Sequence, residues 1–233
     1  QLELSGIEHS RRRNLYGRHL VGAALTKRIG AICKLANEMI DEWFNPDSGM
    51  TEYDPLTGKY TMELGKAFAN EFPIRVVCQV LGFPDEARDK FYYWYKYMMG
   101  GIGGRDYEQK GLMARQDLED FVESIVEERR LKPNFLLDDE GNEVAPDIIS
   151  ELCKTVVDGD VLSTEEITSN IALIVGGGGE TTRGAILNMW YLLLQHPDQM
   201  EAVLNNDPLW DAAFHETLRH SSSIGCQQCQ NTL

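Results

Sequence analysis

Four consecutive glycines, followed by an acid and an alcohol, form the most unusual pattern in the sequence. Residues 176–179 are glycines, and Glu180 and Thr181 follow directly. The run falls within a helical period of apolar residues, where each interior glycine costs roughly 0.8–1 kcal/mol relative to alanine. Such a conflict between local propensity and overall pattern is typical of functional sites. One interpretation is close packing between helices. The other is a flat, bulky ligand against the backbone, with Glu180 and Thr181 relaying protons to it.

Two kinds of nucleotide-binding motif do not match the glycine run in their spacing. A dinucleotide-binding fingerprint needs a third glycine where Thr181 stands, and a strand before it. A phosphate-binding loop needs a lysine followed by serine or threonine, and no lysine lies near the run. The run is therefore not interpreted as a nucleotide site.

A glutamate and an arginine three residues apart form a second signal. Glu216 and Arg219 would share one face of a helix and pair there. His215 suggests a zinc-protease motif, but that motif needs a histidine where Arg219 stands. His220 lies about 140° around the helix from His215. We therefore exclude zinc.

A histidine and an arginine four residues apart, His9 and Arg13, form a third signal. They fall in a very basic segment and would again share a helix face. One interpretation is a basic helix that is simply solvated. The other is a pair of side chains that bind the carboxylates of a cofactor.

Helical periodicity dominates the chain and would position these residues. Ser163 and Glu166 form a capping box, which begins a helix that continues to about residue 196. Gly100, Gly101 and the glycines after them are expected to break the chain, and residues 138–145 to form an acidic loop. Proline and glycine at 54–60 mark a turn between two short strands. Further helices are expected over residues 8–20, 23–44, 62–81, 107–131, 148–157, 197–204 and 208–220. The prediction is a mainly α fold with little β structure.

Composition narrows the function classes. The chain has 233 residues, of which 42% are hydrophobic, and its net charge is −15. This acidity argues against nucleic acid as a partner, because phosphates need cations, and against an anionic membrane surface. No apolar run reaches the 18 or so residues of a membrane span. Five scattered cysteines suit free thiols. We expect a soluble, cytoplasmic protein.

Together and in this order, the three signals resemble motifs of the cytochrome P-450 family, the haem-thiolate monooxygenases, in its bacterial soluble type. Residues 177–182, Gly-Gly-Gly-Glu-Thr-Thr, resemble the family's (A/G)GX(E/D)T(T/S) motif. Glu216-X-X-Arg219 resembles its ExxR motif, and His9-X-X-X-Arg13 its basic helix. The segments LGFPDEARDKF and LLLQHPDQ are similar as well. The resemblance implies a single partial domain over 1–233, from about the C helix to just past the K helix.

The resemblance implies roles for the residues near the glycine run. Thr181 would hold the hydrogen-bond network around bound oxygen, and Glu180 would feed protons into it. Gly177 and Gly178 would let haem b and oxygen approach the helix. Ile174 would face the substrate pocket.

The resemblance also implies roles for the other motifs. His9 and Arg13 would bind the haem propionates. Glu216 and Arg219 would be structural and would stabilise the core around the cofactor. Residues 91–99, rich in aromatics and methionine, would lie over the substrate entry, although ordinary core packing explains them equally well.

The implied partners are a lipophilic small-molecule substrate, O2, and an electron donor of the ferredoxin or flavodoxin type. If they face outward, Arg11, Arg12 and Arg18 would offer that donor a basic patch on an otherwise acidic protein.

The sequence departs from the family in one respect that bears on activity. The family's Phe-X-X-Gly-X-X-X-Cys-X-Gly loop, whose thiolate binds iron, does not occur in residues 1–233. The N-terminal sheet has no counterpart either. We therefore expect a partial chain that is inactive alone. The alternative is a truncated or decayed helical relative without haem. Cys226 and Cys229 are interpreted as an accidental pair and not as iron ligands.

Overall fold

The computed structural model describes residues 5–17, 19–103, 108–137, 140–141, 143–157 and 159–223. These residues are mainly helical, with three short two-stranded sheets, which confirms the predicted fold class. The chain divides into two compact units, each described by itself. Unit 1 comprises Gln1–Glu38 and Ile74–Gly177, and unit 2 comprises Met39–Pro73 and Gly178–Leu233. Among the described helices, none is both long and apolar enough to cross a bilayer.

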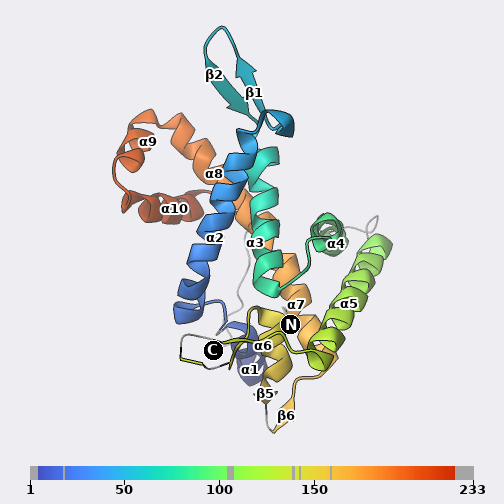
Figure 1. The fold of residues 1–233 in the computed structure, drawn as a ribbon. Coiled ribbons are helices and arrows are strands. Elements are labelled where there is room, and N and C mark those ends of the chain that lie inside the picture. Colours follow the sequence, from blue (N-terminus) through green and yellow to red (C-terminus); the bar gives the residue numbers. More distant parts are fainter. Residues whose placement is uncertain are drawn as a thin grey trace. The chain divides into compact units, whose positions relative to one another are not determined.

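Unit 1 is built from helices that meet around one apolar core. α4 packs along α5, and α6 packs against both α5 and α1 (Figure 1). The helices that lie wholly or mostly in this unit are α1 (Gly6–Gly17), α2 (Gly22–Trp43), α3 (Glu71–Leu81), α4 (Ala87–Gly103), α5 (Glu108–Leu131), α6 (Ile148–Lys154) and α7 (Thr164–Gly178).

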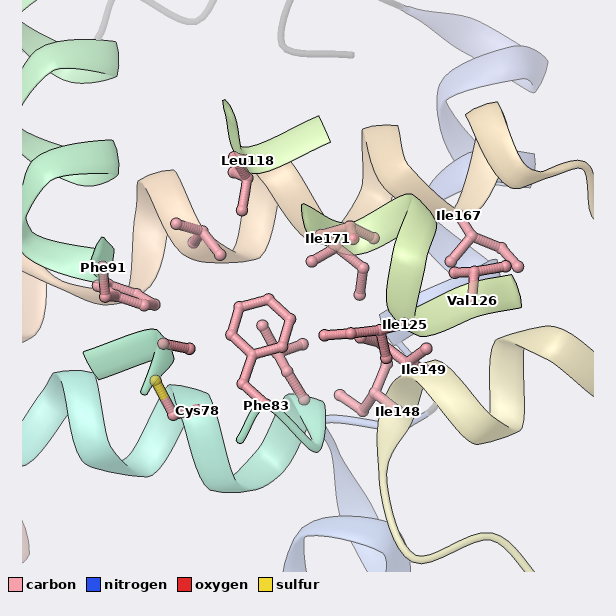
Figure 2. Close-up of a cluster of buried hydrophobic side chains, with 14 of the residues drawn as sticks. Cys78, Phe83, Phe91, Leu118, Ile125, Val126, Ile148, Ile149, Ile167 and Ile171 are labelled. Carbon is pink, nitrogen blue, oxygen red and sulfur yellow. The ribbon is translucent and has the colours of Figure 1, made fainter. Parts of the chain in front are cut away.

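The core of unit 1 joins side chains from α3 through α7. Figure 2 shows Phe83 among side chains of this cluster, which also includes Leu118 of α5 and Ile171 of α7. Phe91 and Trp94 of α4 have exposed fractions of 0%. Burying each such side chain stabilises the fold by roughly 1.5–3 kcal/mol. The core-packing interpretation of residues 91–99 is therefore confirmed for these two rings.

A tight corner joins α3 to α4. Gly82 has φ +79°, and its N–H donates to the carbonyl of Cys78 at 3.0 Å. The buried side chain of Asp147 lies directly against Gly82 and caps α6, accepting from the N–H of Ser150 at 2.7 Å. Arg129 Nη2 lies 3.9 Å from the same carboxylate. Because Gly82 has no side chain, the carboxylate of Asp147 has room to lie against it.

Unit 2 contains a β-hairpin and a set of packed helices. Thr51 pairs with Met62 and Asp54 with Lys59, so the expected turn at 54–60 does join two antiparallel strands (Figure 1). α8 packs against η2, α9 and α10. The main elements are β1 (Thr51–Asp54), β2 (Lys59–Met62), the π-helical turn η2 (Gly65–Ala69), α8 (Glu180–Gln195), α9 (Pro197–Leu204) and α10 (Leu209–His220).

The long central helix is present but interrupted at one residue. α7 ends at Gly178, α8 begins at Glu180, and Gly179 between them has φ −84° and ψ −79°. An α-helical residue has ψ near −42°, so Gly179 lies outside regular helix geometry. The expectation of one continuous helix over 163–196 is corrected in this respect. Glycine tolerates the deviation because it has no Cβ.

Two glycines expected to break the chain do not do so. Gly100 and Gly101 lie within α4, which continues to Gly103. A helical glycine costs about 1 kcal/mol, and the packing of α4 against α5 overrides this local preference.

Three other segments also differ from expectation. Within 138–145, Glu143–Val144 is a strand that pairs with Leu136–Leu137. Val156 and Val157 pair with residues 160–161 instead of continuing α6, as β-branched residues favour strands. The helix expected over 62–81 is divided into η2 and α3.

The capping box at the start of α7 forms as predicted. Ser163 Oγ accepts from the N–H of Glu166 at 3.1 Å, and Glu166 Oε2 accepts from the N–H of Ser163 at 2.9 Å. We expect Ser163→Ala to lower the free energy of unfolding of the 233-residue chain by about 1 kcal/mol, because a backbone donor loses its partner. Urea denaturation measures the change. Ser10→Ala, on the exposed surface of α1, is the control and should have little effect; an equal loss in both variants would refute the role of the cap.

Candidate functional site

The basic helix α1 presents Arg11 and Arg13 to solvent. Arg11 and Arg13 are exposed, and His9, one turn before Arg13, is half-buried. Leu15 packs against the core of unit 1 and lies about 160° around the helix from Arg13. His9 and Arg13 therefore lie one turn apart on a helix, as their spacing predicts. The side chain of Arg12 and the whole of residue 18 lie outside the described residues.

The glycine run is open at Gly177. Gly177 is exposed, and a Cβ placed there would meet no heavy atom of the described residues within 4 Å beyond its chain neighbours and the backbone of its own helix. Close packing between helices therefore does not explain this glycine. Gly178 is half-buried. Ile174, one turn earlier, is half-buried and packs against the core of unit 1, so that core takes up at least part of its side chain.

The first turn of α8 carries Glu180 and Thr181. Glu180 Oε1 accepts from Arg183 Nη1 at 2.7 Å, and Arg183 Nε donates to Asn70 Oδ1. Thr181 is half-buried. The sequence interpretation missed Arg183, although its i, i+3 spacing from Glu180 is the pattern that identified the Glu216 pair. Asn70 lies 113 residues away and gives no local signal.

Glu216 and Arg219 form the predicted ion pair on α10. Arg219 Nε and Nη2 donate to the two carboxylate oxygens at 2.7 and 2.6 Å. Both side chains are exposed, with 61% and 70% of their area accessible. The hydrogen bond from Arg219 lowers the pKa of Glu216.

This pKa shift predicts a pH-dependent contribution to stability. Folded Glu216 has a lower pKa than unfolded Glu216, so the pair stabilises the chain above the ordinary value of about 4.3 and loses its effect as the pH falls further. In low salt at pH 7 we expect Glu216→Gln to have a slightly lower Tm than the parent, and the difference to shrink as the pH falls below the ordinary pKa of a glutamate. Salt should reduce it, because exposed pairs are screened. Glu201→Gln on α9 is the control, and a difference that persists at low pH contradicts the pairing.

A cavity in unit 1 is lined by none of the predicted site residues. It has a volume of about 800 Å³ and mixed charges, including Lys34, Glu38 and Arg88. In the part of the chain that the structure describes, no three His, Cys, Asp or Glu side chains cluster as a metal site would require. Cys226 and Cys229 lie outside that part.

The predicted residues are distributed over both units. Glu216 and Arg219 are in contact in the structure. Glu180 and Thr181 are consecutive residues in the first turn of α8. Unit 1 holds His9, Arg13, Ile174 and Gly177, and unit 2 holds Gly178, Glu180, Thr181, Glu216 and Arg219.

Comparison with known proteins identifies the family. The family model described as cytochrome P450 matches residues 79–229, well over half of the chain. The chain belongs to the cytochrome P450 family. The family's members are haem-dependent monooxygenases, which are oxidoreductases.

Individual relatives and a solved structure agree with this family. A cytochrome P450 of Bacillus subtilis is 32% identical over 163 residues, covering 70% of this chain and 37% of the relative. The 6-deoxyerythronolide B hydroxylase of Saccharopolyspora erythraea is 27% identical over 213 residues, covering 91% and 46%. The structure of the Bacillus subtilis cytochrome P450 PksS matches with a TM-score of 0.75 at 24% identity, covering 93% of this chain and 49% of that one, and supports the fold. The chain spans about half the length, or less, of the relatives it matches.

Proposed function

We propose that the protein carrying this chain is a haem-dependent monooxygenase that inserts one oxygen atom of O2 into a lipophilic small molecule. The observation that carries the proposal is the exposed backbone at Gly177, three residues before Glu180 and in the same family motif as Glu180 and Thr181. One relative is named a hydroxylase, which supports the reaction type. In the same proposal, residues 1–233 are part of one cytochrome P450 domain.

The residues present fit a haem group. The exposed Arg13 and half-buried His9 on α1 would hold the propionates, since cationic donors form strong hydrogen bonds to carboxylates. Gly177 and Gly178 would leave room for the flat ring. When bound, haem b supplies the iron at which O2 is activated with two electrons. The family's cysteine loop does not occur in residues 1–233, so none of this chain's residues is proposed as the iron ligand.

Two side chains at the start of α8 would transfer protons to the site. Glu180 would pass protons through its carboxyl group to Thr181 Oγ1, directly or through water, and Thr181 would donate onward. A positioned acid of this kind contributes typically 10²–10⁴-fold to a rate. Ile174 would contribute apolar surface to the substrate pocket, and Glu216 with Arg219 would stabilise the surrounding fold.

The proposal includes the partners and the location expected from the sequence. Arg11, exposed on α1, would help dock a ferredoxin- or flavodoxin-type electron donor, because opposite charges steer association. The scattered cysteines suit a reducing cytoplasm.

The test is spectroscopic. Protein expressed from the gene that encodes this chain is supplied with haem, reduced and exposed to carbon monoxide. We expect the absorbance band of thiolate-ligated haem, and product from a panel of lipophilic compounds when an electron donor is added. No band, or only the band of non-specifically bound haem, contradicts the proposal and favours a haem-free helical relative.

A paired substitution tests the role of Gly177. Gly177→Leu and Gly30→Leu both replace a helical glycine with no heavy atom within 4 Å of the new Cβ. We expect each to raise the free energy of unfolding by up to about 1 kcal/mol, because leucine favours helix more than glycine does. Only Gly177→Leu should weaken haem binding in a haem titration. Equal haem binding by the two variants would remove Gly177 from the site.

A further inference from the structure

Glu180 is held by a side chain that the proposed proton path does not use. Arg183 Nη1 donates to Glu180 Oε1 at 2.7 Å, and Nε of the same guanidinium donates to Asn70 Oδ1. One planar group therefore connects the first turn of α8 to the residue that ends η2. Because the guanidinium donors form a rigid fork, fixing the acceptor of one donor sets the direction of the others.

Asn70 is itself fixed in place. Its N–H donates to the carbonyl of Gly65 at 2.9 Å and closes the π-helical turn η2. Ala69, next to it, is fully buried, and η2 packs against α8. A Cβ at Gly65 would lie 3.7 Å from Leu187 of α8, which shows how close the two elements are. The main chain of Asn70 is therefore fixed within unit 2, and from this fixed position its Oδ1 accepts from Arg183 Nε.

The fork determines on which side of α8 the carboxylate lies. Glu180 and Arg183 are three residues apart and share a face, whereas Thr181 is about 100° further around the helix than Glu180. The ion pair therefore holds the carboxylate on the side of Arg183. Its distance from Thr181 Oγ1 then depends on where Asn70 holds the guanidinium.

We propose that Arg183, fixed by Asn70, is a positioning residue that sets where the Glu180 carboxylate lies relative to Thr181. The inference rests on the proposed function and adds two residues to it. Hydroxylation of a substrate RH takes O2, two electrons from the donor and two protons, and gives ROH and water. If proton delivery is misdirected, the same O2, two electrons and two protons would give hydrogen peroxide, and the substrate would stay unchanged. A misplaced Glu180 should therefore lower the amount of alcohol formed per electron and raise the amount of peroxide. The affinity for substrate should stay the same.

The first measurement needs no haem. In the ¹⁵N-labelled 233-residue chain, the Arg183 Nε–H signal is assigned by its loss in Arg183→Lys. We expect slow exchange of this proton with water in the parent and in Asn70→Asp, which keeps an oxygen acceptor, and fast exchange in Asn70→Ala. Equal exchange rates in the two Asn70 variants would overturn the proposal.

The second measurement counts alcohol and peroxide per electron in the haem-loaded protein. We expect Asn70→Ala and Arg183→Lys to lower alcohol per electron by at least about threefold, a part of what a positioned acid contributes, with unchanged substrate affinity. Asn70→Asp should keep the parent ratio. The ratio does not depend on the amount of folded protein, so a purely structural role would leave it unchanged.

Arg115→Lys, at a guanidinium that pairs with Glu119 on α5, is the matched control and should keep the parent ratio. An unchanged ratio in Asn70→Ala and Arg183→Lys overturns the positioning role. A parent protein that binds no haem contradicts the proposed function instead, and the exchange measurement still decides whether the contact between Asn70, Arg183 and Glu180 exists.

Discussion

Gly82→Ala is expected to lower the free energy of unfolding of the chain by about 2–4 kcal/mol. Gly82 has φ +79°, where a side chain costs roughly 1–2 kcal/mol. The new Cβ would also lie 2.7 Å from Cβ of the buried Asp147 and closer still to its carboxylate. Asp147 must then move and stop capping α6, a further loss of about 0.5–2 kcal/mol. Urea denaturation followed by circular dichroism measures the total.

Gly58→Ala separates backbone strain from the collision with Asp147. Gly58 has φ +68°, and a Cβ there would meet no heavy atom within 4 Å. Only the strain of about 1–2 kcal/mol should therefore appear in this variant. Similar losses at the two positions would mean that Asp147 does not lie against Gly82.

Phe91→Ala is expected to cost about 3–5 kcal/mol, because a fully buried ring leaves a cavity that its neighbours fill only in part. The ring belongs to the core cluster in Figure 2, to which α3, α5 and α7 also contribute side chains. A loss of this size is a large fraction of the roughly 5–15 kcal/mol typical of a folded domain. The midpoint of urea unfolding should fall accordingly.

The adjacent Tyr92→Ala is the control for Phe91. Tyr92 lies on the same helix but is 51% exposed, so its removal should cost much less. If Tyr92→Ala were as damaging as Phe91→Ala, the assignment of the inner face of α4 would be wrong.

Elements with local signals could be predicted from the sequence. Pro197 fixes the start of α9, and the structure begins that helix at this residue. Ser163 and Glu166 satisfy each other's backbone N–H groups within four residues of sequence. The hairpin follows from the proline and glycine at 54–60. In each case the stabilising contacts lie within a few residues, so the pattern alone contains them.

Features that depend on distant partners could not be predicted. Gly100 and Gly101 remain helical because α4 packs on α5, which no local preference reveals. The face of α2 that carries Ile29 and Ile40 resembles a buried stripe, yet these two side chains are exposed.

The same reason limits prediction of the candidate site. The glycines, Glu180 and Thr181 are visible in sequence because they are contiguous. Asn70 is not, because its role depends on how η2 packs against α8. Arg183 lies between these cases. Its spacing from Glu180 predicts an ion pair, but nothing local predicts its contact with Asn70.

The reactivity of the buried Cys78 thiol would report how often the core of unit 1 opens. Burial in the core raises the pKa of Cys78 to about 12, so near neutral pH the group stays protonated and unreactive while unit 1 is closed. Cys33 is exposed on α2. A thiol-directed alkylating agent would therefore modify the two cysteines at different rates. The rate at Cys33 would depend on the reagent, and the rate at Cys78 on how often the core of unit 1 opens.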